Sequence, residues 1–328
     1  MFSLLLTIGL IIQGFILGFP GFFVQELIIS FLPYTLGFNI LIIGILLCNG
    51  IVTKKKRFFA LILGYSIFGY LLYTTYQGIY HTSITQDNTT TGNNDITFFY
   101  GNIYYQNKET EQLITIITGS NPDIIMLVEY SKSHDELLTP LLKKTYPYVS
   151  RYIGSKGYDG DIIFSKYPIK NITHTIIPGS FSHITVSHST QDIDIALVHT
   201  SAPVSKHYFD MRTNQLHELD NLLNTYYSGE NKDQHLIVAG DFNITPWSSY
   251  YTTQMKLPFE RIGLTNITTN TTATTYNRDI PYTRCLSQAN LICAHIDHIR
   301  SNMSSIQLKQ ITLPGSDHYG FVGTIRLP

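Results

Sequence analysis

The chain has 328 residues and a nearly balanced charge, with 22 basic and 23 acidic residues and a formal net charge of −1. This length allows one large domain or two units. The balance excludes a strongly basic protein that would bind nucleic acid through its overall charge. The charges are unevenly distributed, so the first quarter of the chain and the remainder differ in kind.

Residues 1–80 are almost free of charge. Glu26 is the only charged residue from Met1 to Thr53. A basic block follows at Lys54–Arg57, and the next charged residue is Asp87. Three apolar stretches lie here, at about Phe2–Phe19, Leu27–Val52 and Phe58–Tyr80. Each is close to or longer than the roughly 18–20 residues that cross a bilayer core as a helix, and none shows the polar stripe of a helix in a soluble core. We therefore expect residues 1–80 to form a membrane anchor of three transmembrane helices.

The nature of the first stretch and the start of the second stay open, whereas the basic block indicates how the stretches are oriented. The first stretch is alternatively a cleaved signal peptide, although it lacks a basic start and a clean cleavage site of small residues. Pro33 lies inside the second stretch and either kinks that helix or marks a later start near Tyr34. Basic loops stay in the cytoplasm. Lys54–Arg57 therefore predicts a multi-pass protein of the cell (inner) membrane, with all residues beyond Tyr80 extracytoplasmic.

The remainder of the chain alternates strands and helices. Residues 81–94 are polar, unpatterned and rich in turn formers, which predicts a linker. Strands are expected at 96–100, 124–128, 161–164, 184–187, 193–198, 236–239, 294–299, 306–311 and 319–325, and helices at 109–120, 137–144 and 209–226. The predicted class is α+β. Transmembrane helices are followed, over residues 95–328, by a four-layer α/β-sandwich of two packed, mostly antiparallel sheets flanked by helices.

Four short segments of this second part each place a carboxylate, often with a neighbouring amide or imidazole, at the end of an apolar run. They are Pro122–Glu129, Gly240-Asp241-Phe242-Asn243, Ile296-Asp297-His298-Ile299 and Ser316-Asp317-His318. A buried strand delivers the polar residue at its end to the edge of a sheet, so these groups can meet. Asp241 and Asn243 are two apart in an extended segment, so both side chains point to the same side. Several carboxylates gathered with neutral imidazoles suit a hard divalent cation, Mg²⁺ or Mn²⁺, that works on phosphate esters.

The order and spelling of these motifs resemble the endonuclease/exonuclease/phosphatase superfamily, over roughly Asp95–Pro328. The string at Gly240–Asn243 is the most recognisable part of the resemblance. The family usually has Gln before the glutamate of the second motif, where this chain has Val128. Thr245-Pro246-Trp247-Ser248 resembles a membrane-anchored bacterial branch, similar to teicoplanin-resistance membrane proteins. That likeness implies a polyprenyl diphosphate phosphatase.

The resemblance also implies a metal site. Glu129 is expected to be the principal ligand of the cation, with Asn102 and Asp317 beside it. Asn102 matches the Asn that opens the first motif of the family, and it would ligate or orient the metal and the phosphate. Asp241 is expected to hold the metal or the attacking water.

The remaining residues are expected to handle the phosphate and the proton. Asn243 would donate to a phosphoryl oxygen as negative charge builds there, and His199 would contact the phosphate. By resemblance, His318 activates water or stabilises the phosphorane, and Asp297 fixes its tautomer through a hydrogen bond. His298 should face away from Asp297 and be structural.

The expected reaction is in-line attack of water on phosphorus without a covalent intermediate, since no motif for a nucleophilic serine or cysteine is present. Residues after position 80 hold 18 basic and 22 acidic side chains, which disfavours nucleic acid. Tethering beside the lipid bilayer favours a lipid-linked phosphorylated substrate. The alternatives are an extracytoplasmic metal-dependent nuclease and a catalytically silent scaffold.

Two further positions are ambiguous in the sequence. Cys285 and Cys293 are either bridged, as an exported domain allows, or two free buried thiols. Arg212 lies in the predicted helix at 209–226 and is expected to be a helix-surface or packing residue.

Overall fold

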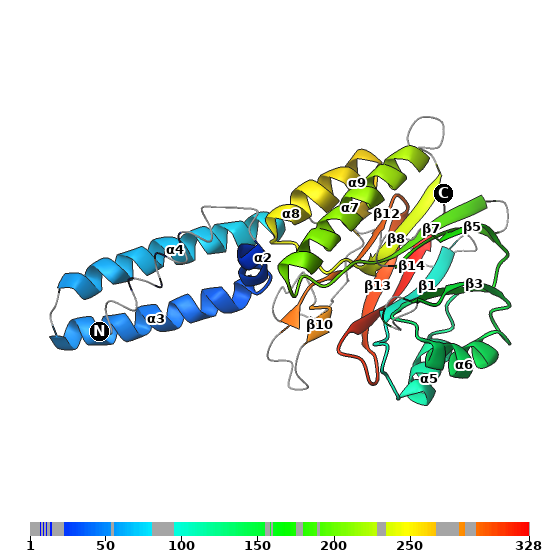
Figure 1. Cartoon of the computed structure of the whole chain (residues 1–328), viewed down its shortest axis with the longest axis horizontal. Helices are drawn as coiled ribbons and strands as arrows, with labels where there is room; N and C mark the ends of the chain where they lie inside the picture. The colour runs from blue at the N-terminus through cyan, green and yellow to red at the C-terminus, as the bar shows by residue number, and fades with distance from the viewer. Residues whose placement is uncertain are drawn as a thin grey trace.

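The computed structural model describes residues 7, 9, 11, 14, 23–53, 56–80, 95–154, 158, 160–174, 180–188, 191–227, 234–266, 282–285 and 293–327. Two six-stranded sheets pack face to face, helices cover their outer faces, and a pair of long helices extends from one end (Figure 1). The predicted mixed fold of two packed sheets flanked by helices is confirmed. The predicted linker at 81–94 and most of the first apolar stretch lie outside the described residues.

The first sheet has the strand order β13-β14-β1-β2-β4-β3. Its strands are β1 (Asp95–Asn102), β2 (Ile124–Val128), β3 (Tyr148–Tyr152), β4 (Asp161–Ser165), β13 (Ser304–Thr312) and β14 (Tyr319–Arg326). β1 and β2 are parallel and joined by helix α5 (Thr110–Ser120), whereas the other neighbours are antiparallel. Helix α5 and helix α6 (Lys132–Leu142) cover the outer face through a cluster that includes Leu113, Leu138 and Phe164.

The second sheet has the strand order β5-β6-β7-β8-β12-β9. Its strands are β5 (Ile169–His174), β6 (Ser180–His188), β7 (Gln191–His199), β8 (His235–Asp241), β12 (Asp297–Ser301) and β9 (Thr265–Asn266). β7 and β8 are parallel and joined by helix α7 (Lys206–Tyr226), and the other neighbours are antiparallel. Helix α7, helix α8 (Ser249–Tyr251), the π-helix η2 (Thr252–Lys256) and helix α9 (Leu257–Arg261) cover the outer face.

A separate two-stranded ribbon carries the late cysteines. It pairs β10 (Arg284–Cys285) with β11 (Cys293–Ala294) in antiparallel register. Cys285 and Cys293 face each other in this register and form a disulfide. The bridged alternative for these two residues is therefore the one that the structure contains.

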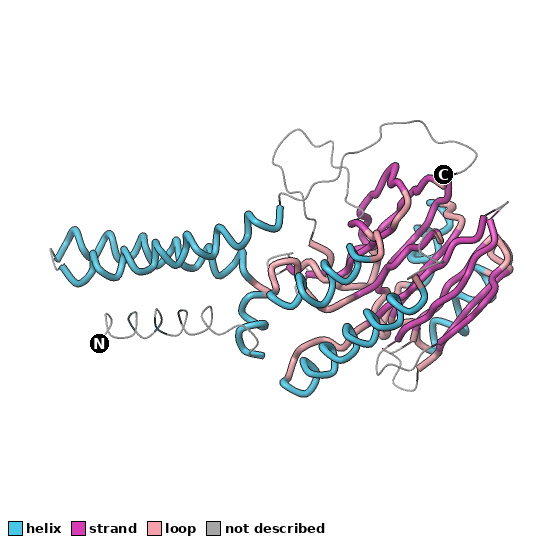
Figure 2. Tube along the Cα trace, turned by 90° about the horizontal axis from the view of Figure 1, so that it is seen from above, coloured by secondary structure: helices cyan, strands magenta, loops and turns pink. Residues whose placement is uncertain are grey.

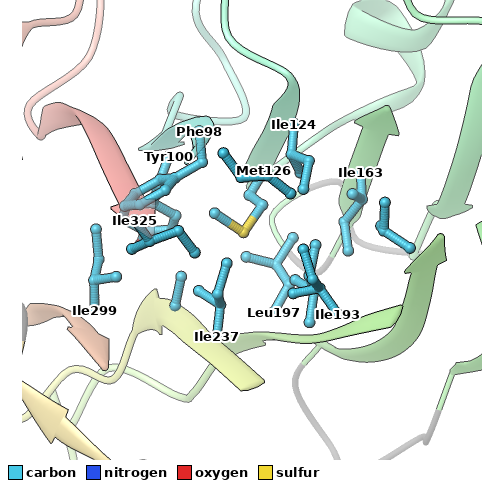
Figure 3. Packing of buried hydrophobic residues seen from close by; sticks show 14 of the residues in the cluster. Phe98, Tyr100, Ile124, Met126, Ile163, Ile193, Leu197, Ile237, Ile299 and Ile325 are labelled. Carbon is cyan, nitrogen blue, oxygen red and sulfur yellow. The ribbon is translucent and has the colours of Figure 1, made fainter. Parts of the chain in front are cut away.

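The central strands are buried on both faces. In β1, Phe98 and Tyr100 point into the core between the sheets (Figure 3). Phe99, between them, packs against the outer helices. In β8, Ile237 faces the same core and Leu236 faces helix α7. Successive side chains of a strand point to opposite faces, so a strand covered on both sides is a continuous apolar run. This is why the runs at 124–128 and 236–239 stand out in the sequence.

The N-terminal apolar segment forms helices α2 (Phe23–Ile29), α3 (Leu32–Thr53) and α4 (Lys56–Tyr80). α3 and α4 lie side by side as an antiparallel pair (Figure 2), packed through a small apolar cluster that includes Leu46 and Tyr65. The stretch expected over 27–52 is divided by a bend of 77° between α2 and α3, so of the two alternatives for Pro33 the structure contains the later start, at Leu32. Pro33 lies in the first turn of α3, where its missing N–H leaves no intrahelical bond unmade, so a new helix starts there.

Within the described residues, no single helix is both long and apolar enough to cross a membrane. The bent pair of Phe23–Ile29 and Leu32–Cys48 meets the requirements of length and composition together, and Phe59–Leu71 of α4 is a shorter apolar helix. The three predicted transmembrane helices therefore stay a prediction.

Two element boundaries differ from the predicted ones for local reasons. Helix α6 begins at Lys132, five residues before the predicted start at 137, because the Ser131 hydroxyl accepts a hydrogen bond from the His134 amide at the helix N-terminus. The strand predicted over 294–299 is split into β11 and β12. At the break, the Thr283 hydroxyl oxygen accepts from the amides of Ile296 and Asp297.

The close approach of β7 and β8 requires glycine at position 240. A Cβ there would lie 2.1 Å from the carbonyl oxygen of Val198 on the neighbouring strand. Gly240→Ala should force the strands apart and lower the free energy of unfolding by about 1–3 kcal/mol, measured by urea denaturation. Gly119→Ala in helix α5 is the matched control, since no atom lies within 4 Å of its Cβ position and alanine favours a helix interior. Equal stability of Gly240→Ala and wild type would contradict this account.

Candidate active site

The candidate site lies at one end of the sandwich, where the two parallel strand pairs finish. Parallel neighbours end at the same edge of a sheet, and an antiparallel neighbour begins there. Six predicted site residues lie at or directly beside such strand ends: Asn102, Glu129, His199, Asp241, Asp297 and His318. The register places Asp297, the first residue of β12, opposite Asp241, the last residue of β8. Topology alone thus brings residues nearly 220 positions apart to one place.

Asn102 joins the carboxylates of the two sheets. Its side-chain nitrogen Nδ2 donates to Glu129 Oε1 at 2.9 Å and to Asp241 Oδ2 at 3.0 Å. Its side-chain oxygen Oδ1 accepts from the backbone amide of Tyr104. Glu129 Oε2 accepts from the Tyr105 amide at 3.0 Å. Glu129 has a φ of 58°, a left-handed backbone of the kind that clusters at functional sites. In this orientation Asn102 positions both carboxylates rather than offering a cation its oxygen.

Asp241 is a buried acid in a crowded electrostatic environment. Burial and the charge of Asp297 raise the pKa of Asp241 to about 6, although the positive groups around it, His318 foremost, act in the opposite direction. A carboxyl group with this pKa loses its proton readily when a cation arrives. Asp241 is therefore suited to binding a cation near neutral pH.

His318 and Asp297 form a buried pair. His318 Nδ1 lies 2.9 Å from Asp297 Oδ2, and the other carboxylate oxygen accepts from the Tyr100 hydroxyl at 2.7 Å. Burial acts to lower the pKa of His318, but the charge and hydrogen bond of Asp297, with the charge of Asp241, raise it to about 9. Burial acts to raise the pKa of Asp297, but His318 brings it below its usual range. With Nδ1 held by Asp297, Nε2 is the nitrogen that faces Asp241, at 3.6 Å.

His199 and Asn243 border the same carboxylates. His199 Nε2 lies 3.9 Å from both Glu129 Oε1 and Asp241 Oδ2, beyond hydrogen-bonding distance. The Asn243 side-chain nitrogen donates to the Thr200 carbonyl oxygen at 2.8 Å. One of the two hydrogens on that nitrogen is used by this bond. The other has no acceptor among the residues that the structure describes, so it can donate to a further group.

Three side chains of this site have donor atoms close enough to share one cation. Ligand atoms of Glu129, Asp241 and His318 all lie within 4.8 Å of one another. Mg²⁺ and Mn²⁺ prefer oxygen ligands, so the two carboxylates suit either ion. The His318 imidazole, whose pKa is raised to about 9, is protonated near neutral pH and suits a cation less well. Asp317, expected as a ligand, lies outside this group. Its Oδ2 accepts from Arg284 Nε at 2.8 Å, and its Oδ1 lies 3.9 Å from His318 Nε2. The group thus contains Glu129, expected as the principal ligand, and Asp241, expected to hold the metal or the attacking water.

Sequence reasoning missed three residues of the site. Tyr100 lies in an apolar run and reads as a core residue, yet its hydroxyl crosses between the sheets to Asp297. Arg284 opens the short strand β10, and Thr283 directly precedes it, in a segment with no periodic pattern. The Thr283 hydroxyl oxygen accepts a hydrogen bond from the Asp297 amide, and the backbone of Arg284 forms an isolated antiparallel β-bridge with that of His318. None of the three belongs to a motif or a periodic pattern that would mark it as a site residue in a single sequence.

Two residues with predicted secondary roles have clear positions. His298 Nε2 lies 2.8 Å from the Ile244 carbonyl oxygen, on the side away from its neighbour Asp297. Burial holds the pKa of His298 well below its usual value, so its imidazole is neutral. Arg212 is fully buried, so the helix-surface alternative for it is wrong.

The family follows from a match over most of this domain. The model of the Endonuclease/Exonuclease/phosphatase family matches residues 101–318. The chain belongs to this family. Members are hydrolases that act on phosphate esters, and the matched range contains all the residues placed at the site above except Tyr100, which lies one position before it. No curated protein sequence matches the chain.

Several solved structures share the fold of this chain. D. rerio TDP2 complexed with a single-strand DNA product has 14% identity and a TM-score of 0.54, covering 71% of this chain and 99% of its own. An endonuclease/exonuclease/phosphatase from Beutenbergia cavernae has 17% identity and a TM-score of 0.52, covering 71% and 72%. A mutant beta toxin of Staphylococcus aureus with bound magnesium ions has 17% identity and a TM-score of 0.50, covering 70% and 99%. At these identities the likeness concerns the fold alone.

Proposed function

We propose that the protein is a membrane-anchored, metal-dependent phosphoesterase that hydrolyses a phosphate ester or diphosphate by in-line attack of water. The observation that carries this proposal is the meeting of Glu129, Asp241 and His318 within 4.8 Å, in a chain of this family. The similar beta toxin structure contains magnesium ions, which supports Mg²⁺ as the cation. Bound mainly through Glu129 and Asp241, Mg²⁺ would neutralise charge on the phosphoryl oxygens.

The side chains of this protein divide the remaining work. Asn243, with one free amide hydrogen, and His199 bind the phosphoryl oxygens as charge builds there. Nε2 of His318 handles the proton, since Nδ1 is engaged with Asp297. Asp297 keeps the ring in one orientation and is itself held by Tyr100. Water attacks phosphorus directly, so no side chain becomes covalently modified.

The proposed substrate is lipid-linked because of the N-terminal helices. The pair of α3 and α4 exposes many large apolar side chains: Phe38, Ile40, Leu41, Ile45, Leu47, Phe59, Leu63, Ile67 and Leu71. An apolar surface of this extent is typical of contact with a membrane or another protein. Anchoring in a bilayer raises the effective concentration of substrates confined to the same membrane. This supports the branch that resembles teicoplanin-resistance proteins.

Arg284 supports a diphosphate as the leaving or retained group. Its side chain is about one-third exposed and donates through Nε to Asp317. Among the described residues its two terminal nitrogens have no hydrogen-bond partner. Arginine presents such nitrogens as a planar fork that matches phosphate oxygens. A second phosphate, next to the one at the carboxylates, would be bound there.

A nuclease is the second candidate. The similar TDP2 structure contains a DNA product, and the family includes enzymes of this kind. Against it, residues after position 80 hold 18 basic and 22 acidic side chains, and phosphate backbones are bound by clustered positive charge. The phosphatase is therefore the better supported of the two.

A substrate panel tests the proposal on the full-length protein in lipid nanodiscs. The panel contains farnesyl diphosphate, sphingomyelin, phosphoinositides, inorganic pyrophosphate and plasmid DNA, each with Mg²⁺ or with a chelator. Farnesyl diphosphate should release orthophosphate fastest, and only with Mg²⁺. Faster cleavage of plasmid DNA would favour the nuclease, and full activity in the chelator would end the metal mechanism.

Variants of the buried pair show whether the turnover comes from this site. His318→Ala should lower the rate by about 10²–10⁴, as loss of a general acid–base does. The double variant of His318→Ala and Asp297→Asn should be little slower, because the two residues act as one unit. His298→Ala is the matched control and should affect stability more than turnover. Losses that multiply in the double variant would show two independent residues.

The membrane orientation has its own test. A reporter that is active only outside the cytoplasm should work when fused after Tyr80 and fail when fused at Lys56, since the basic loop is proposed to be cytoplasmic. The reverse pattern would place the catalytic domain inside and remove the argument for a substrate in the outer leaflet.

A further inference from the structure

A buried ion pair connects the N-terminal segment to the catalytic domain. Glu26, in helix α2, lies 2.8 Å from Arg212 Nη2 in helix α7, and both side chains are almost fully buried. The hydroxyl oxygen of Ser248 lies 2.6 and 2.7 Å from the two oxygens of the same carboxylate. Glu26 is the only charged residue in the first 53. A single acid in so apolar a segment, paired across 186 positions, indicates a specific contact.

The contact is reinforced by packing around it. The Trp247 indole donates to the Ser30 carbonyl oxygen at 3.0 Å, and its ring packs with Leu32 at the start of α3. The rings of Phe23 and Phe209 lie 6.1 Å apart, between α2 and α7. Helix α2 is therefore held on the domain beside the 240–248 segment, and the pair of α3 and α4 extends outward from this point (Figure 1).

Arg212 contacts the active site with its other terminal nitrogen. Nη1 donates to the Asn243 carbonyl oxygen at 2.6 Å. Asn243 has a φ of 49°, a left-handed conformation that an L-residue keeps only when its surroundings hold it. Arg212 thus bridges Glu26 and the backbone of the residue proposed to bind a phosphoryl oxygen.

The neighbouring carbonyl groups are held in the same way by other elements. The carbonyl oxygens of Asp241 and Phe242 accept from the amide and hydroxyl of Thr200, and that of Ile244 lies 2.8 Å from His298 Nε2. Each of these three donors belongs to the family-matched domain. Arg212 differs because its counter-charge comes from the N-terminal segment, and a buried guanidinium is strongly disfavoured without one.

We infer that Glu26 is a positioning residue for Asn243 and acts through Arg212. The docking of helix α2 on the catalytic domain then sets the geometry of the phosphate-binding backbone. Hydrolysis depends on an N-terminal segment that contributes no atom to the reacting centre. The expected effect on hydrolysis rests on the proposed function. The expected effect on the backbone of Asn243 does not depend on it.

The test compares Glu26→Gln with wild type in the full-length protein, with farnesyl diphosphate and Mg²⁺. Glutamine keeps the size and an acceptor for Ser248 but removes the counter-charge of Arg212. The kcat should fall by about 10²-fold, as for a misplaced catalytic group, with KM nearly unchanged. Glu26→Asp keeps the charge and should recover most of the rate. It also serves as the second variant if Glu26→Gln fails to fold.

Asp95→Asn is the matched control. It breaks another ion pair, with Arg326, at the start of β1, the end of that strand remote from the site. Loss of stability there should leave kcat at the wild-type value, so a fall in kcat cannot be attributed to destabilisation alone. Hydrogen exchange of the backbone amides at 242–248 gives a second readout and should accelerate in Glu26→Gln but not in Asp95→Asn.

The outcomes separate the two claims. A folded Glu26→Gln protein with wild-type kcat and wild-type exchange at 242–248 overturns the positioning role and leaves the proposed function intact. A wild-type protein that hydrolyses no ester with Mg²⁺ overturns the proposed function, and the exchange rates then decide the positioning role on their own.

Discussion

The amide of Asn102 between the carboxylates of Glu129 and Asp241 is the interaction on which the site depends. The two acids come from different sheets, and like charges at such distances repel strongly where water is excluded. Asn102 donates to both, at 2.9 and 3.0 Å, which offsets part of this repulsion. Burial and the charge of Asp297 raise the pKa of Asp241 to about 6. An acid pair held in this environment is suited to a divalent cation, which would neutralise both carboxylates.

The same end of the sandwich also ties the two sheets to each other. The Tyr100 hydroxyl, from the first sheet, donates to Asp297 of the second, and Asp297 in turn binds His318, which precedes a strand of the first. Packing of the apolar core sets the distance between the sheets, and this chain of hydrogen bonds sets their alignment at the site. Changes in core packing should therefore reach the catalytic geometry through these residues.

Much of the fold and several site residues could be predicted from the sequence, because local patterns of residues indicate them. The runs ending at Glu129 and Asp241 are apolar on both faces, and their motifs are short and contiguous. Tyr100 and Thr283 could not be predicted, since their roles depend on partners 197 and 14 positions away. Glu26 was visible as a lone charge, but its partner Arg212 looks like any helix residue. The break before Pro33 was ambiguous for the same reason, because only contacts such as that of Trp247 with Leu32 decide where α2 ends.

The central claim is that Glu129 and Asp241 form one divalent-cation site, and calorimetric titration of the metal-free protein with Mn²⁺ tests it most directly. The account predicts one ion per chain. Its affinity should fall as the pH drops through about 6, because Asp241, with its raised pKa, must lose a proton to bind the ion. Glu129→Gln should abolish this binding without unfolding the domain. Binding that is equally tight at pH values on both sides of 6, or unchanged in Glu129→Gln, would contradict the account.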